Sequence, residues 1–179
     1  TTFTVGVLAD SLDEPNETVT LTLSSATNAT ISDATGTLTI TDDDATPSLA
    51  INDVAITEAA ANSTFTVTLS AVSGLAVTVN YATSNGTATA GADYTAKSST
   101  QLTIAAGATT ATFTVGVLAD TLDEANETAT LTISSPANAT ISDATGTLTI
   151  NDNDATPTLA INDRAITEAA ANATFTVTL

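Results

Sequence analysis

The chain has 179 residues and a formal net charge of −18, with Lys97 and Arg164 as its only basic residues against 20 Asp and Glu. Nucleic-acid binding needs a basic surface, so a nucleic-acid partner is excluded. The negative charge also argues against docking on anionic membranes, and no apolar run is long enough to span a bilayer. Cys and His are absent, which excludes Ser-His and Cys-His catalysis and the usual zinc sites, so we expect no enzyme.

The first strand expected from the sequence lies at residues 2–5, where Thr alternates with Phe3 and Val5. An acidic run follows at 10–17, and the pattern of strand, acidic run and strand returns at 113–118, 120–127 and 128–133. Such alternation indicates half-buried β-strands, so each acidic run is a turn between two strands. Carboxylates this dense repel each other, and either a cation or exposure to water must relieve the repulsion.

The chain contains an internal repeat with an offset of 110 residues, since Phe3 corresponds to Phe113 and Leu69 to Leu179. Residues 1–69 and 111–179 match nearly throughout, which suits a tandem array of whole domains. The linkers at 42–47 and 152–157 are polar and end in Pro, which stops a strand. We therefore expect residues 1–44 to be the C-terminal part of one domain, 48–154 a complete domain, and 158–179 the N-terminal strands of the next, within a longer array.

Seven strands are expected in the complete repeat. In the first, the apolar phase flips at Asn52 and Asp53, which predicts a bulge or a strand that changes sheets. The remaining strands are predicted at 64–69, 77–81, 102–104, 110–118, 128–134 and 147–150, with loops at 84–96 and 136–145. Seven short alternating strands in about a hundred residues predict an all-β fold, the immunoglobulin-like β-sandwich.

Four motifs of this repeat stand out by their order and spacing: Ile56-Thr-Glu58, Val77-Thr-Val-Asn-Tyr81, Gly86-Thr-Ala-Thr-Ala-Gly-Ala-Asp-Tyr94 and Gly146-Thr-Leu-Thr-Ile-Asn-Asp152. Together they resemble the Calx-β domain family. The resemblance implies tandem seven-stranded sandwiches and, in many members, Ca²⁺ sites at one end. Members occur as calcium sensors in sodium–calcium exchangers and as tandem arrays in bacterial surface proteins.

The topology of an immunoglobulin-like sandwich brings most of the acidic residues to one pole, because the loops after the first, third and fifth strands lie there and the last strand ends there. In the complete repeat these segments carry Glu58, Asp93, Asp120, Asp123, Glu124, Asp152 and Asp154. The first copy adds Asp10, Asp13, Glu14, Asp42 and Asp44. Ca²⁺ requires oxygen ligands of this kind, so these residues are the candidate metal ligands, while Mg²⁺ demands stricter octahedral geometry.

The alternative is a solvated acidic face, which is the usual interpretation of a charge run. Convergence from four separate segments weighs against it. Ala119 and Thr121 flank Asp120, and Asn153 stands where the first copy has Asp43. Since calcium-sensing Calx-β members often carry more Asp at these positions, we predict one or two weak sites rather than a four-ion cluster.

Two functions from different classes fit this sequence. The first is an extracellular or cell-surface stalk, adhesin or fibre of tandem repeats, with Ca²⁺ bound near each linker. Its partners would be neighbouring identical repeats of the same or an adjacent chain, and a cell-surface or glycan target stays open. The second is a regulatory calcium sensor within a larger membrane or signalling protein. Near-identical repeats and the thinned acidic sites favour the first.

The short linkers predict head-to-tail joints with few allowed orientations. At such a joint, loops 70–74, 105–108 and 136–145 of the following domain are expected to face the acidic pole of the preceding one. Carboxylates at that pole repel one another, so we expect bent states without a cation and a straighter rod with Ca²⁺.

Overall fold

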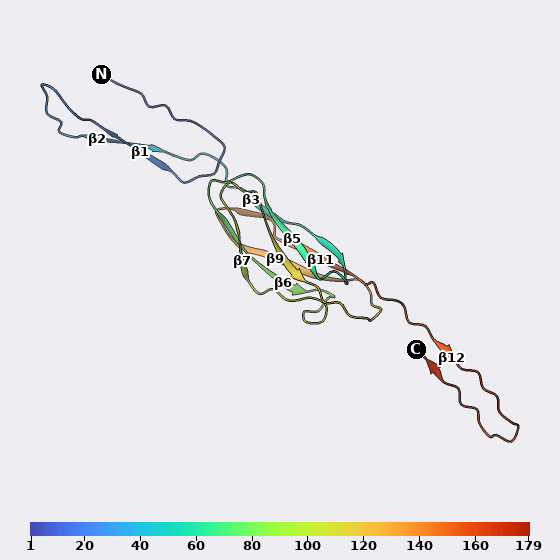
Figure 1. Ribbon diagram of the computed structural model, residues 1–179. Coiled ribbons are helices and arrows are strands. Elements are labelled where there is room, and N and C mark those ends of the chain that lie inside the picture. Colours follow the sequence, from blue (N-terminus) through green and yellow to red (C-terminus); the bar gives the residue numbers. More distant parts are fainter.

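The computed structural model describes residues 1–179, which form a central β-sandwich with one extended segment at each end (Figure 1). A four-stranded sheet with the order β10-β3-β5-β8 packs on a five-stranded sheet with the order β4-β11-β9-β6-β7. All regular elements are strands, so the predicted all-β sandwich is confirmed. No segment forms a helix of the length and apolar character needed to cross a membrane.

The two sheets are built from nine strands. Those of the first are β10 (Thr140–Asp143), β3 (Ser48–Ile51), β5 (Asn62–Leu69) and β8 (Thr110–Gly116). Those of the second are β4 (Val54–Thr57), β11 (Thr145–Asn151), β9 (Glu127–Ala137), β6 (Val77–Asn85) and β7 (Thr100–Ile104). Neighbouring strands are antiparallel except for two parallel pairs, β10–β3 and β11–β4.

The core lies between the sheets and consists of the alternating apolar residues. In β5, Phe65 and Val67 are buried while Thr64 faces solvent. Phe113 of β8 stacks on two aromatic rings, with its centroid 5.7 Å from that of Phe65 and 3.8 Å from that of Tyr81. Truncating a buried ring to Ala typically costs about 3–5 kcal/mol. This cluster therefore links the two sheets in the middle of β5, β8 and β6.

The phase flip at Asn52 and Asp53 is confirmed as a change of sheet, because β3 belongs to the first sheet and β4 to the second. Side chains hold the crossing: Asn52 Oδ1 accepts a 2.7 Å hydrogen bond from the Thr66 amide, and Asp53 Oδ1 accepts one of 2.7 Å from the Thr147 amide. The backbone of Gly146 passes so close that a Cβ there would lie 2.5 Å from the Asn52 carbonyl oxygen. Only glycine fits at that crossing.

The prediction of a loop at 136–145 is wrong. Strand β9 runs on to Ala137, Asn138 turns with a φ of 59°, and β10 returns to pair with β3. The Thr140 amide donates to the Pro47 carbonyl at 2.9 Å, and Ser142 Oγ donates to the Leu49 carbonyl at 3.0 Å. The reason is that β3 would otherwise leave its backbone groups unpaired at a sheet edge.

The two extended segments are poorly packed copies of parts of the sandwich. Residues 1–44 form only β1 (Glu17–Thr22) and β2 (Thr35–Ile40), and the strand expected at 2–5 is absent. Residues 158–179 form only β12 (Ala160–Ile161) and β13 (Val177–Thr178). Phe3 is 72% exposed where its counterpart Phe113 is 7% exposed, and Leu159 is 73% exposed where Leu49 is fully buried. The same residues are buried only where both sheets are complete.

We predict that residues 48–154 fold alone with one cooperative thermal transition, whereas isolated 1–44 and 158–179 do not fold. An incomplete sandwich leaves an apolar face and open edges that offset the gain from strand pairing. Circular dichroism melts and the amide dispersion in NMR spectra of the three separate pieces test this. A soluble 1–44 peptide with a cooperative melt would contradict the prediction.

Candidate metal centre

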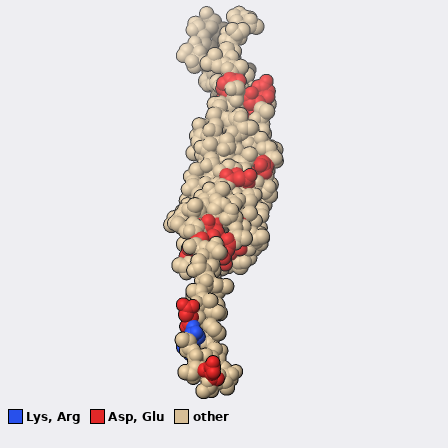
Figure 2. All heavy atoms as spheres, turned by 90° about the vertical axis from the view of Figure 1, so that its right-hand side faces the viewer, with Lys and Arg blue, Asp and Glu red and all other residues tan.

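Acidic side chains lie in patches along the long axis of the molecule, and in this view a basic side chain shows only on the lower extended segment (Figure 2). In the central sandwich, two clusters of acidic side chains form where the loops β4–β5, β6–β7 and β8–β9 meet the residues after β11. They are called the first and the second group. The first contains Glu58, Asp152 and Asp154, and the second contains Asp93, Glu124 and Glu127. Within each group, one oxygen of every carboxylate lies within 4.8 Å of the others.

Glu58 is the best-anchored member of the first group. It follows β4, its amide donates to the Asn151 carbonyl at 2.9 Å, and its side chain is only 7% exposed. One carboxylate oxygen, Oε1, accepts a 2.9 Å hydrogen bond from the Asp120 amide. Glu58 thereby links the end of β4, the end of β11 and the acidic turn. Its second oxygen remains free to serve as a ligand.

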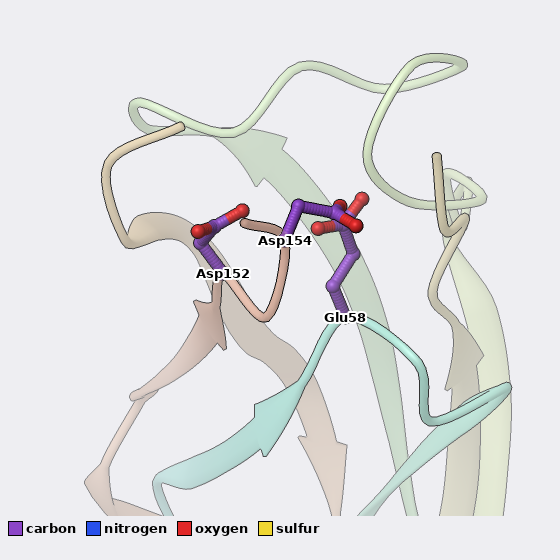
Figure 3. A group of neighbouring side chains, drawn as sticks. All are labelled: Glu58, Asp152 and Asp154. Carbon is purple, nitrogen blue, oxygen red and sulfur yellow. The ribbon is translucent and has the colours of Figure 1, made fainter. Parts of the chain in front are cut away.

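Asp152 and Asp154 reach the same point from the segment after β11 (Figure 3). Asp152 Oδ1 and Asp154 Oδ2 are buried without any hydrogen-bond partner. A buried carboxylate oxygen that lacks a donor is costly, and both sit in a group of like charges. Neither Lys97 nor Arg164 lines the adjoining cavity, which is about 10 Å³ in volume and is bordered by Glu58, Asp93, Glu124, Ala125, Glu127, Ile150 and Asp152. That volume suits a single water or ion.

The second group is held by the β6–β7 loop and the start of β9. Asp93 Oδ2 accepts a 2.6 Å hydrogen bond from the Thr89 amide, which fixes the carboxylate against its own loop. Partial desolvation, followed by the charges of Asp120, Asp93, Glu58 and Asp152, raises the pKa of Glu124. Desolvation, a side-chain hydrogen bond with Asp93 and the charges of Asp93, Glu124 and Glu58 raise the pKa of Glu127. Each shift reflects a carboxylate that is forced among others.

The donor set fits calcium. All ligand atoms are hard oxygens from several loops, and the orphaned oxygens of Asp152 and Asp154 point to a missing positive partner. Ca²⁺ accepts six to eight such oxygens in flexible geometry, whereas zinc prefers nitrogen and sulfur ligands. A bound Ca²⁺ would be held by Glu58, Asp152 and Asp154, with Asp93, Glu124 and Glu127 as a second set.

Five of the candidate ligands predicted in the complete repeat lie in these groups, namely Glu58, Asp93, Glu124, Asp152 and Asp154. Asp120 lies outside them: its Oδ1 accepts a 2.7 Å hydrogen bond from the Leu122 amide, although its charge is near enough to act on Glu124. Asp123 turns to the linker, where its Oδ1 accepts a 3.4 Å hydrogen bond from Thr156 Oγ1.

The first copy does not assemble an equivalent centre. Asp10, Asp13, Glu14, Asp42 and Asp44 provide no group of three carboxylates at ligand spacing. They still influence each other, since desolvation and neighbouring carboxylates raise the pKa of Glu14 and of Asp44. The loops that carry Glu58 and Asp93 have no counterpart in residues 1–44, so the pole is missing two of its four sides.

Four residues with a role at the acidic turns were not among the predicted ligands. Glu127 belongs to the second group, and its signal was its position as the last residue of the acidic run 120–127. Asn126 Oδ1 accepts a 3.0 Å hydrogen bond from the Asp152 amide, and Asn153 Oδ1 accepts one of 3.0 Å from the Ala59 amide. Asn16 repeats the first contact with the Asp42 amide, also at 3.0 Å. A repeated Asn within each acidic run was the available signal for this positioning role.

The family model of the Calx-beta domain matches residues 1–44 and 41–154. Three solved structures share the fold. The apo-form Calx CBD1 domain has a TM-score of 0.57 and 20% identity over 62% of this chain and 100% of that chain. CBD12 from CALX1.2 has a TM-score of 0.57 and 21% identity over 64% of this chain and 48% of that chain. The calcium binding domain CBD12 of CALX1.1 has a TM-score of 0.56 and 22% identity over 68% and 53%, respectively. Comparison with curated protein sequences gave no match.

The raised pKa values predict an unusual pH dependence in the presence of a chelator. In the folded protein the pKa values of Glu124 and Glu127 are raised above the ordinary value of 4.5. At a pH above 4.5 the folded protein therefore holds more protons on these carboxylates than the unfolded chain does. The free energy of unfolding should therefore rise as the pH falls from neutral towards the ordinary pKa of 4.5, and this gain is lost again as the pH rises through the raised folded-state pKa. Calorimetry across that range measures it.

The variants Glu124→Gln and Glu127→Gln should flatten this dependence, because each removes a proton-binding carboxylate while keeping a similar shape. Asp143→Asn, at the end of β10 and outside the two groups, is the matched control and should leave the slope unchanged. A wild-type melting temperature that falls steadily on acidification from neutral pH would contradict the account.

Proposed function

Because this chain belongs to the Calx-beta domain family, we propose that each complete repeat binds Ca²⁺ at its acidic pole and serves as a structural module of an extracellular stalk, adhesin or fibre. The observation that carries the calcium part is the pair of buried, unpartnered oxygens of Asp152 and Asp154 against Glu58. Ca²⁺ supplies the positive charge that no Lys or Arg lining the cavity provides. Binding joins β4, the acidic turn and the segment after β11.

The structural role is supported by the form of the repeats. The central sandwich and the two partial copies follow one another along one axis, with the acidic pole beside the linker that leads to residues 158–179 (Figure 1). Near-identical neighbours suit a module whose contribution is length and stiffness rather than a specialised response. A cell-surface location would expose such modules to millimolar calcium, which matches weak sites.

A regulatory calcium sensor is the second candidate, because one of the similar structures is described as a calcium binding domain of CALX1.1. The two candidates differ in the affinity that they need. Extracellular modules bind Ca²⁺ with dissociation constants of about 10⁻⁴–10⁻³ M, whereas sensors bind at about 10⁻⁷–10⁻⁵ M.

We predict that Ca²⁺ raises the melting temperature of the chain. At ten times the dissociation constant, one site stabilises the folded state by about 1.4 kcal/mol, which corresponds to a shift of about 5–10 °C. Asp154→Asn should abolish most of the shift because it removes a ligand charge and keeps the side-chain shape. Asp143→Asn is the matched control and should keep it. Equal melting temperatures in chelator and in millimolar Ca²⁺ would leave only an acidic surface.

We predict a dissociation constant in the extracellular range, about 10⁻⁴–10⁻³ M, from calorimetric titration of the full chain with CaCl₂. The two carboxylate groups allow one or two ions, so the stoichiometry should not exceed two per chain. A constant below about 10⁻⁵ M would favour the sensor and argue against the structural module.

A further inference from the structure

The acidic turn of the first copy makes a direct contact with the central sandwich. Asp13 forms an isolated parallel bridge with Ser73, which lies in the loop between β5 and β6. The Gly74 amide donates to the Asp13 carbonyl at 3.1 Å. Ser73 Oγ lies 3.1 Å from that carbonyl oxygen and 3.3 Å from Asp13 Oδ2, and it donates to them. Ser73 is 1% exposed, so this contact is shielded from water.

The receiving loop is rigid in its own right. Ser73 Oγ accepts the Leu75 amide at 3.0 Å, and the Ser73 carbonyl accepts the Gly107 amide at 2.9 Å. Gly74 permits the close approach, because a Cβ at this position would lie 2.7 Å from Glu14 Cγ and Oε1. A side chain there would push the acidic turn away. The loop therefore presents a buried hydroxyl and a bare backbone to its neighbour.

Asp13 also holds the linker, since Thr46 Oγ1 donates to its Oδ1 at 3.4 Å. Its two carboxylate oxygens are thus occupied by the linker on one side and by the following repeat on the other. Asp13 therefore belongs to the joint between the two repeats, and it is not a member of any cluster of three carboxylates at ligand spacing. The contacts of Asp13 with Thr46 and Ser73 involve no cation. They are separate from any reduction of carboxylate repulsion that a cation would bring at the pole.

The next joint along the chain is half assembled in the same way. Asp123 is the counterpart of Asp13, and its Oδ1 holds Thr156 at 3.4 Å as Asp13 holds Thr46 at 3.4 Å. Asp123 and Leu122 are exposed, the latter to 60%, whereas Asp13 and Leu12 are half-buried in the first joint. Residues 122–124 therefore leave open the surface that residues 12–14 use against Ser73 and Gly74.

We propose that residues 122–124 form a docking surface for a further copy of the same repeat, which binds through the loop equivalent to 70–75. Asp123 receives the hydroxyl of the copy's Ser73 equivalent, and its carbonyl receives the amide of the following Gly. The acidic turn then has two faces: Glu124 belongs to the calcium groups, and Asp123 to the repeat–repeat joint. The joint goes beyond the calcium proposal because it needs no cation.

The joint is tested in the full chain in the presence of a chelator, so that its failure is separate from failure of the calcium proposal. Amide hydrogen exchange at Gly74 reports the contact. Asp13→Ala should speed this exchange by about tenfold, Ser73→Ala should do the same, and the double variant should add little, because both remove one interaction. Asp123→Ala is the matched control: it makes the same change in the equivalent turn of the next repeat, where the residue has no Ser73 partner, and it should leave exchange at Gly74 unchanged.

The docking surface itself is tested by extending the chain with a second copy of residues 70–154 after Leu179, which completes the third repeat. In that longer chain Asp123→Ala should speed exchange at the new Gly74 equivalent by about tenfold and broaden the distance distribution from X-ray scattering. Unchanged exchange at Gly74 in Asp13→Ala, or no effect of Asp123→Ala in the extended chain, would overturn the proposal. So would a loss of calcium affinity in Asp13→Ala without any change at the joint.

Discussion

One electrostatic constraint defines the candidate metal centre: carboxylates converge at one end of the sandwich with no basic side chain among the residues that line their cavity. In water such charges would separate, but Glu58, Asp152 and Asp154 are anchored to strands that the core holds in place. The sheets therefore maintain a repulsive arrangement that loops alone would relax. The raised pKa values of Glu124 and Glu127 and the orphaned oxygens of Asp152 and Asp154 follow from the same constraint. A divalent cation bound at these groups would supply the positive charge that they lack.

Neutral amide side chains let the pole stay compact without adding charge. Asn126 fixes the Asp152 amide and Asn153 fixes the Ala59 amide, so two of the segments are positioned by groups that do not repel the ligands. Asn153, which stands where the first copy has Asp43, accepts the Ala59 amide with a neutral oxygen and so links the residues after β11 to the β4–β5 loop without adding a charge to the site. At this pole the carboxylates therefore supply the negative charge, while the Asn side chains hold the backbone in position.

The sequence predicted the strands and their sheets well. It predicted less well the contacts that these sheets make with neighbouring segments of the chain. Alternation located the strands, the phase flip at Asn52 predicted the change of sheet, and topology brought five ligand candidates together. The strand β10 was missed because its pairing depends on an open edge of β3 rather than on its own residues. The strand expected at 2–5 does not form because its sheet partners have no counterpart beside it. Asp13 and Asp123 look like ligands in the sequence, and only the contacts of Asp13 with Ser73 and Thr46 and of Asp123 with Thr156 show another role.

One acidic turn thus carries residues of two kinds, with Glu124 at the sandwich pole and Asp123 at the linker. The central claim is that Glu58, Asp152 and Asp154 bind Ca²⁺. The most direct measurement is a crystal structure of the full chain grown in millimolar CaCl₂, with anomalous scattering used to locate calcium. The account predicts an ion within about 2.3–2.6 Å of an oxygen of each of these three residues. Two results would contradict it: water alone between the three carboxylates with no anomalous peak, or an anomalous peak coordinated by Asp123 in place of Asp154.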